Sequence, residues 1–206
     1  MLINQGINDG VTQVLSKINQ SLISGKPLFV FIAGGSCSGK TTLTKELKKC
    51  LPQASILSMD DYFRNFNDPD LPHENDRVSF EKPDSYHLIE LTNHLEELNQ
   101  YHSVLAPIYD LKHNQRTEDK KTVFASNIII VEGLFSINLG KELNLNQIKI
   151  FVDAPYRTRL LRRVDRDHNI ASEEVVEHFF RCYIEPCYRK LIFPQSNFAD
   201  LIIKNE

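Results

Sequence analysis

A glycine-rich turn lies between a short apolar run and a series of leucines at helical spacing. Residues 34–41 (GGSCSGKT) match the pattern G-x-x-x-x-G-K-[ST]. The run before them, residues 28–33 (LFVFIA), is typical of a strand buried on both faces of a parallel sheet. Glycines allow such a turn to form a concave nest of N–H groups, and a helix start adds partial positive charge. The sequence therefore predicts a phosphate-binding loop.

The residues of this loop predict a nucleoside triphosphate with Mg²⁺. Lys40 can reach the β- and γ-phosphates, and the hydroxyl of Thr41 is placed to bind the metal that bridges them. We interpret Cys37 as a small side chain. The expected ATP-binding residues are Gly34, Gly35, Ser36, Cys37, Ser38, Gly39, Lys40, Thr41 and Thr42. The N-K-x-D pattern of GTPases and the L-S-G-G pattern of transporter ATPases are absent from the sequence, which favours a small-molecule kinase.

Apolar runs and helical patterns alternate along the chain. This alternation implies right-handed crossovers and a parallel sheet with helices on both faces, the three-layer α/β/α arrangement of P-loop NTPases. The expected strands are residues 28–33, 55–58, 127–131, 148–152 and 199–203. The expected helices are residues 9–24, a helix from Thr41 to Leu51, and residues 87–99, 156–167 and 173–188. We expect one domain over residues 1–206, with an N-terminal helical segment (1–26) and substrate-side excursions at 64–82 and 107–121.

The composition argues against several classes of protein. With 24 basic and 27 acidic residues, the formal net charge is -3, so no overall cationic field favours nucleic acid. Apolar runs stay well short of the roughly 18 residues that span a bilayer, and the first residues lack the order of a signal peptide. We expect a cytoplasmic chain that binds neither nucleic acid nor membranes. Its four cysteines should be reduced thiols.

Two acidic positions follow predicted strands. Asp60 comes after residues 55–58, and Glu132 follows residues 127–131. Because α/β sheets bind ligands at the carboxyl ends of their strands, both side chains should face the loop. We assign Asp60 to accept the proton of an attacking hydroxyl and Glu132 to the metal. Asp61 is interpreted as a helix cap or a surface residue.

A predicted helix carries arginines at helical spacing. Arg159, Arg162, Arg163 and Arg166 form one stripe, and an apolar stripe of Leu160, Leu161 and Val164 lies beside it. The helix should therefore turn one face to the core and one face to anions. Guanidinium groups suit phosphate oxygens, and Arg163 and Arg166 are the preferred candidates.

Seven segments, in their order and spacing, are similar to those of one family. They are GGSCSGKTT, SMDDYF, FEKPD, PIYDLKHNQR, IIIVEGLF, IFVDAPYRTRLLRRVDRD and FADLII. Over residues 28–204 the chain resembles the uridine kinase branch of the uridine kinase and phosphoribulokinase family. The resemblance implies a P-loop kinase that transfers phosphate from ATP to the 5'-hydroxyl of uridine or cytidine with Mg²⁺. Because relatives often form tetramers, homo-oligomerisation stays open.

Roles carried over from the family fall on matching positions. The resemblance implies catalytic roles for Asp60, Lys40, Arg163 and Arg166, and a metal role for Thr41 and Glu132. The substrate-binding residues that it implies are Asp60, Phe80, Glu81, Tyr109, Asn114 and Arg163. His113 is a further candidate from its own position, because it lies in the same segment as Tyr109, where a polar ring could contact a base or a sugar. Glu81 stands where the family usually has an aspartate for the ribose hydroxyls, and Tyr109 matches a tyrosine that contacts the base.

Four departures from the family pattern leave other readings open, and the first is Glu81 in place of the aspartate. Asn114 aligns with the family's histidine, and Leu111 replaces a phenylalanine beside the base. Residues 168–172 replace a lid segment that contains Arg-Gly-Arg. The alternatives are a kinase for another small alcohol, such as nicotinamide riboside or pantothenate, and a nucleotide-binding protein with little catalysis.

Overall fold

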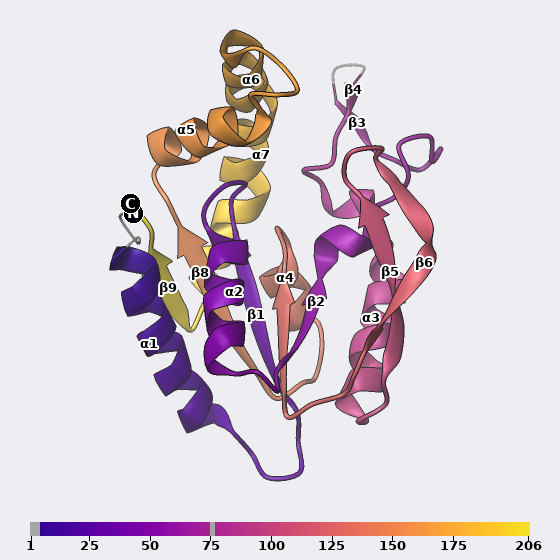
Figure 1. The fold of residues 1–206 in the computed structure, drawn as a ribbon, viewed down its shortest axis with the longest axis vertical. Coiled ribbons are helices and arrows are strands. Elements are labelled where there is room, and N and C mark those ends of the chain that lie inside the picture. The colour runs from indigo at the N-terminus through magenta and orange to yellow at the C-terminus, as the bar shows by residue number, and fades with distance from the viewer. Residues whose placement is uncertain (1–4, 75–76) are drawn as a thin grey trace.

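A parallel sheet of five strands forms the centre of the computed structural model, which describes residues 5–74 and 77–206. The strands are β1 (Leu28–Gly34), β2 (Ser55–Ser58), β7 (Ile128–Glu132), β8 (Gln147–Asp153) and β9 (Leu201–Lys204). Their order is β2-β7-β1-β8-β9, and every neighbouring pair is parallel. Because β1 is the middle strand, the glycine-rich turn leaves from the centre of the carboxyl edge of the sheet (Figure 1).

The residues of β1 alternate between two separate hydrophobic cores. Four helices cover the sheet, namely α1 (Gln5–Ser21), α2 (Lys40–Cys50), α3 (Leu88–Asn99) and α4 (Ser136–Lys141). Phe29 and Phe31 pack in the core that contains α3 and α4, whereas Leu28 and Val30 pack in the core that contains α1 and α2. Both faces of β1 are therefore buried, which explains its unbroken apolar run. The predicted three-layer α/β/α class is confirmed.

Most predicted elements lie within a few residues of their expected bounds. The strand at residues 55–58 matches β2, and the leucines after the turn lie in α2. The first helix differs, because α1 includes Ile7, which is 2% exposed and packs in the core, and ends at Ser21. Residues 1–4 of the expected N-terminal segment lie outside the described residues.

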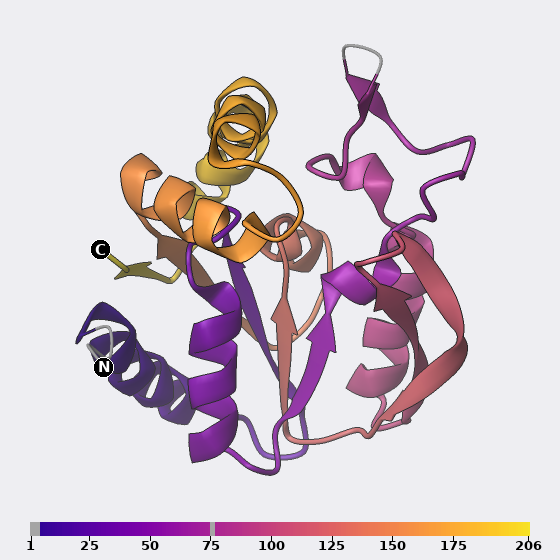
Figure 2. The same cartoon turned by 45° about the horizontal axis from the view of Figure 1, so that its top comes forward.

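A long helical run follows β8. It consists of α5 (Tyr156–Asp167), α6 (Glu173–Phe179), a π-helical turn (Phe180–Ile184), α7 (Glu185–Cys187), a second π turn (Tyr188–Ile192) and a 3-10 helix (Phe193–Phe198). The helix predicted at residues 173–188 is thus the first part of a longer and irregular run. Figure 2 shows the α5 to α6 segment standing over the same end of the sheet as the small hairpin of β3 (His73–Glu74) and β4 (Arg77–Val78).

The segment at residues 107–121 is a hairpin and not the loop that we expected. Strand β5 (Val104–Asp110) pairs antiparallel with β6 (Gln115–Val123). The sequence signal is weak because β6 is an edge strand whose residues are almost all polar and at least partly exposed. The excursion at residues 64–82 contains the β3–β4 hairpin, and residues 75–76 within it lie outside the described part of the chain.

In the described residues no helix has both the length and the apolar character needed to cross a membrane. The four cysteines, all within the described residues, form no disulfide. Cys187 is buried, whereas Cys50 and Cys182 are exposed.

The structure corrects the expected orientation of α5. Arg159, which we placed on the anion-binding stripe, is 1% exposed, and Leu161 of the expected core stripe is 56% exposed. The guanidinium of Arg159 pairs with Glu185 at 2.6 Å, donates to the Ala154 carbonyl at 3.0 Å and lies 3.8 Å from the centre of the Tyr188 ring. This paired cation joins α5 to the later helical run, so Arg159 stabilises the fold.

Replacing Arg159 with alanine should lower the free energy of unfolding by about 3 kcal/mol or more, because Glu185 keeps a buried charge without its inner partner. Arg189 provides a matched control, since it pairs with the same carboxylate at 2.8 Å but its side chain is 74% exposed. Arg189→Ala should lower that free energy by about 1 kcal/mol or less. Urea unfolding measures both values, and equal losses would contradict a structural role for the buried pair.

Candidate active site

The turn after β1 has a backbone that only glycine accommodates at two positions. Gly34 has φ +152° and Gly39 has φ +106°. A Cβ atom on Gly34 would lie 2.3 Å from the Val152 carbonyl oxygen, and one on Gly39 would lie 2.2 Å from the side-chain nitrogen of Asn205. Lys40 begins α2, so the expected phosphate loop leads directly into a helix N-terminus.

Lys40 lies at the electrostatic centre of the site. Its ammonium group donates to the carbonyls of Gly34 at 3.0 Å and Gly35 at 2.9 Å. Desolvation lowers the pKa of Lys40, while Asp60, Glu132 and Glu81 act in the opposite direction. Three chain segments therefore bring carboxylates to one lysine.

Thr41 and Glu132 lie together beside this lysine. The Thr41 hydroxyl donates to the Glu132 carboxylate at 3.1 Å. Desolvation raises the pKa of Glu132, and Lys40 opposes that shift. A hydroxyl and a carboxylate are oxygen ligands that suit Mg²⁺, which usually takes one or two protein ligands together with phosphates and water. Among the described residues no group of three or more histidine, cysteine, aspartate or glutamate side chains is placed to hold a metal ion.

Asp60 and Glu81 form the acidic side of the site opposite the loop. Asp60 lies in a 3-10 turn, Met59–Tyr62, directly after β2. Desolvation raises the pKa of both carboxyls, while Lys40 acts against the shift at each. The Oε2 atom of Glu81 is buried and has no hydrogen-bond partner among the described residues. A hydroxyl-bearing ligand could satisfy this oxygen.

Aromatic rings pack beside the two carboxylates. The Phe63 ring stacks on Tyr86 with centroids 4.4 Å apart, and it contacts Phe80 at 5.2 Å and Tyr109 at 5.5 Å. The Tyr109 hydroxyl donates to the Arg64 carbonyl at 3.1 Å. Sequence reasoning named Phe80 and Tyr109 but missed Phe63 and Tyr86. The signal for Phe63 was its place in SMDDYF, three residues after Asp60.

Tyr86 also carries an unpaired hydroxyl. The residue is 2% exposed, and its hydroxyl has no hydrogen-bond partner in the part of the chain that the structure describes. Desolvation raises the pKa of Tyr86, with further contributions from Asp60 and Glu81. The acidic side of the site thus contains buried polar atoms that the described protein groups leave unsatisfied.

Two of the other predicted arginines of α5 contact the loop. The Arg163 guanidinium donates to the Ser36 hydroxyl at 3.2 Å and pairs with Asp167. Arg162 approaches the Cys37 carbonyl at 3.5 Å. Arg166 pairs with Asp167, a residue of the same helix, at 2.8 Å.

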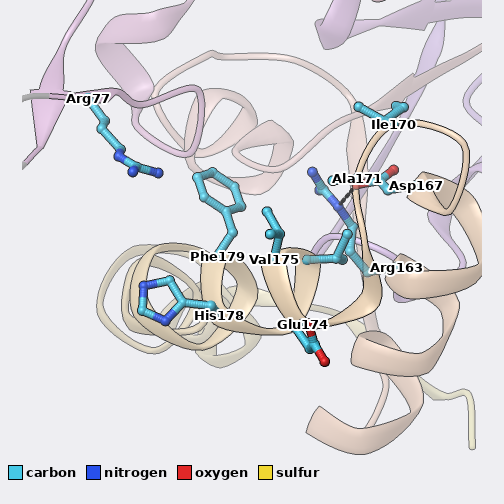
Figure 3. A pocket seen from close by; sticks show the side chains of 10 residues that line it. Arg77, Arg163, Asp167, Ile170, Ala171, Glu174, Val175, His178 and Phe179 are labelled. Atoms are coloured by element: carbon cyan, nitrogen blue, oxygen red, sulfur yellow. Dashed lines mark hydrogen bonds and ion pairs between the residues drawn. The ribbon is translucent and has the colours of Figure 1, made fainter.

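A cavity of about 390 Å³ lies between the α5 to α6 segment and the β4 hairpin. Arg77 comes from the hairpin, whereas Arg163, Val175 and Phe179 come from the helical segment (Figure 3). Because Arg163 both lines this cavity and contacts the loop, the cavity adjoins the site. Its size is in the range of small-molecule pockets.

His113 and Asn114 lie at the turn of the β5–β6 hairpin. The His113 side chain is 59% exposed and pairs with Asp110 at 2.6 Å. Asn114 has φ +51°, and its carbonyl accepts from the Phe66 amide at 2.9 Å. These described contacts do not join either side chain to Tyr109. Both residues have features that are common in turns. The His113 amide donates to the side chain of Asp110, and Asn114 has a positive φ.

Comparison with known proteins shows which family the chain resembles. The model of the phosphoribulokinase/uridine kinase family matches residues 29–206. The chain is 32% identical over 185 residues to a uridine kinase of Lactobacillus johnsonii, covering 87% of each chain. It is 32% identical over 182 residues to a uridine kinase of Bacillus pumilus, covering 86% of each.

A solved structure shows the same fold. It comes from Bacillus stearothermophilus and is described as a possible uridine kinase. It superposes with a TM-score of 0.59 at 20% identity, covering 98% of this chain and 100% of that one. The family match spans the loop, the carboxylates and the arginine helix. The chain therefore belongs to the phosphoribulokinase/uridine kinase family, and it is an ATP-dependent phosphotransferase that acts on a hydroxyl acceptor.

Proposed function

We propose that this kinase transfers the γ-phosphate of ATP to the 5'-hydroxyl of uridine or cytidine. The observation that carries the proposal is that two desolvated carboxylates, Asp60 and Glu81, occur in the same site as the aromatic cluster around Phe63. Carboxylates suit the hydroxyls of a sugar, and aromatic rings suit a flat base. The two relatives named uridine kinase support the same acceptor.

Each group has a distinct role in the proposed reaction. Asp60 orients the acceptor hydroxyl and takes its proton as the oxygen bonds to the γ-phosphorus, while the bond from that phosphorus to the β–γ bridging oxygen breaks and ADP leaves. Lys40 and the loop N–H groups hold the phosphates, and Arg163 and Arg166 stabilise the charge on the transferring group. Thr41 and Glu132 would hold Mg²⁺, which supplies charge neutralisation between the β- and γ-phosphates when bound. Glu81 accepts hydrogen bonds from other acceptor hydroxyls.

A second candidate is a kinase for another small alcohol. The observation that favours it is the hairpin turn, where Leu111 is 64% exposed and His113 pairs with Asp110. Leu111, which departs from the family pattern, is thus turned to solvent. Nicotinamide riboside and pantothenate are the acceptors to compare.

An acceptor panel separates the two candidates. ADP release with ATP and Mg²⁺ is measured against uridine, cytidine, other nucleosides, nicotinamide riboside and pantothenate. We expect the highest kcat/KM with uridine or cytidine. A higher value with another acceptor would replace the proposed substrate while leaving the kinase chemistry in place.

Asp60→Asn should lower kcat by at least about 100-fold, because the amide cannot accept the proton of the attacking hydroxyl. ATP binding should change little. The matched control is Asp61→Asn, since Asp61 is the next residue but pairs with Lys121 at 2.6 Å. Its kcat should stay within a few-fold of the parent enzyme. Steady-state kinetics and ATP titration measure these values, and a fully active Asp60→Asn enzyme would remove Asp60 from its role.

The pH dependence follows from the raised pKa of Asp60. Its neutral form cannot take a proton, so activity should fall with decreasing pH at values above the ordinary 3.8 of an aspartate. Because Glu81 also has a raised pKa, the profile of kcat/KM is compared in two variants. In Glu81→Gln, kcat/KM should still fall with decreasing pH. If that fall is lost in Glu81→Gln but kept in Asp60→Asn, Glu81 is the base.

A further inference from the structure

Asn205, which lies beyond β9, forms a hydrogen bond to the backbone of the phosphate loop. Asn205 follows β9 and is 1% exposed. Its side-chain nitrogen donates to the Ser38 carbonyl at 2.6 Å, and its side-chain oxygen accepts from Arg162 at 3.4 Å. Its own amide donates to the Asp153 carbonyl at 2.8 Å, which continues the pairing of β8 with β9. Through its backbone N–H and its side-chain amide together, Asn205 therefore connects the sheet, the phosphate loop and α5.

The direction of the Ser38 carbonyl matters for phosphate binding. In a trans peptide the C=O and the following N–H point in opposite directions. A Ser38 carbonyl that points to Asn205 therefore turns the Gly39 N–H away from Asn205. N–H groups on the concave side of such a loop are the donors that bind phosphate.

Without a partner for Ser38, this peptide has freedom to rotate. Gly39 adopts φ +106°, and glycine populates positive and negative φ with similar ease. Close contact limits that freedom, because the side-chain nitrogen of Asn205 lies only 2.2 Å from the position that a Cβ atom on Gly39 would occupy. The loop is therefore held by a side chain from outside it as well as by its own glycines.

We propose that Asn205 is a positioning residue for ATP, whose side-chain amide orients the Ser38–Gly39 peptide so that the Gly39 N–H faces the phosphates. Arg162 extends this network, since it contacts both Asn205 and the Cys37 carbonyl. The role concerns the nucleotide side of the reaction. It does not depend on which acceptor is phosphorylated.

Two substitutions test the amide. Asn205→Ala removes the donor, and loss of one buried hydrogen bond should raise the Kd for ATP about tenfold. Asn205→Asp keeps the size but replaces the donor with a negative oxygen beside a carbonyl and near the phosphates, so the rise should be larger. Both are measured by titration with a fluorescent ATP analogue, which needs no acceptor, and by the KM for ATP. The KM for the best acceptor of the panel should stay within about twofold.

Gln195 is the matched control. It is also 1% exposed, and its side-chain amide donates to the Leu134 carbonyl at 2.7 Å and accepts from the Asn138 amide at 3.1 Å. Gln195→Ala should lower the urea midpoint without changing the Kd for ATP. If Asn205→Ala and Asn205→Asp lower the midpoint in the same way and leave the Kd within twofold of the parent, Asn205 serves only the fold and the proposal is wrong. If uridine fails as acceptor but the Kd rises, only the proposed substrate is wrong.

Discussion

The burial of one ammonium and three carboxylates around the phosphate loop is the constraint on which the site depends. Lys40 begins α2, while Asp60, Glu81 and Glu132 come from separate segments that follow β2, precede α3 and end β7. Their charges oppose the desolvation of the lysine only in part, because the pKa of Lys40 is still lowered. The same four groups hold the phosphates, the metal and the acceptor in the proposed reaction. The groups whose burial is unfavourable in the free protein are therefore the groups that contact the substrates in that reaction.

The arginines of α5 show how burial divides one sequence pattern into different roles. Arg159 turns inward and pairs with Glu185, which joins two helical segments. Arg163 turns to the loop and contacts Ser36, and Arg162 contacts Asn205. The four side chains have the same chemistry and share one face of the helix, but each residue rises about 1.5 Å along the helix axis, so they meet different neighbours. The helix therefore packs against the later helical run near its first turn, and Arg162 and Arg163 contact the phosphate loop further along.

Short apolar runs predicted the sheet well, because strands buried on both faces leave an unambiguous pattern. The hairpin of β5 and β6 was missed, since an edge strand with polar side chains lacks that pattern. The site residues also divide into those that have a local sequence signal and those that lack one. Motif residues next to strand ends, such as Asp60 and Glu132, were predicted in place, whereas Tyr86 and Asn205 lack a local signal. Their positions depend on contacts between distant segments.

The sequence alone determined the phosphate loop, the alternation of strands and helices, and the acidic residues at strand ends. These features are local, because a strand, a glycine turn and a helix start are encoded within about 20 consecutive residues. Only the tertiary structure decided which arginine is buried, which rings surround the acceptor side, and that Asn205 supports Ser38. Those outcomes depend on how helices rotate and pack against one another, and spacing along the chain does not specify that packing.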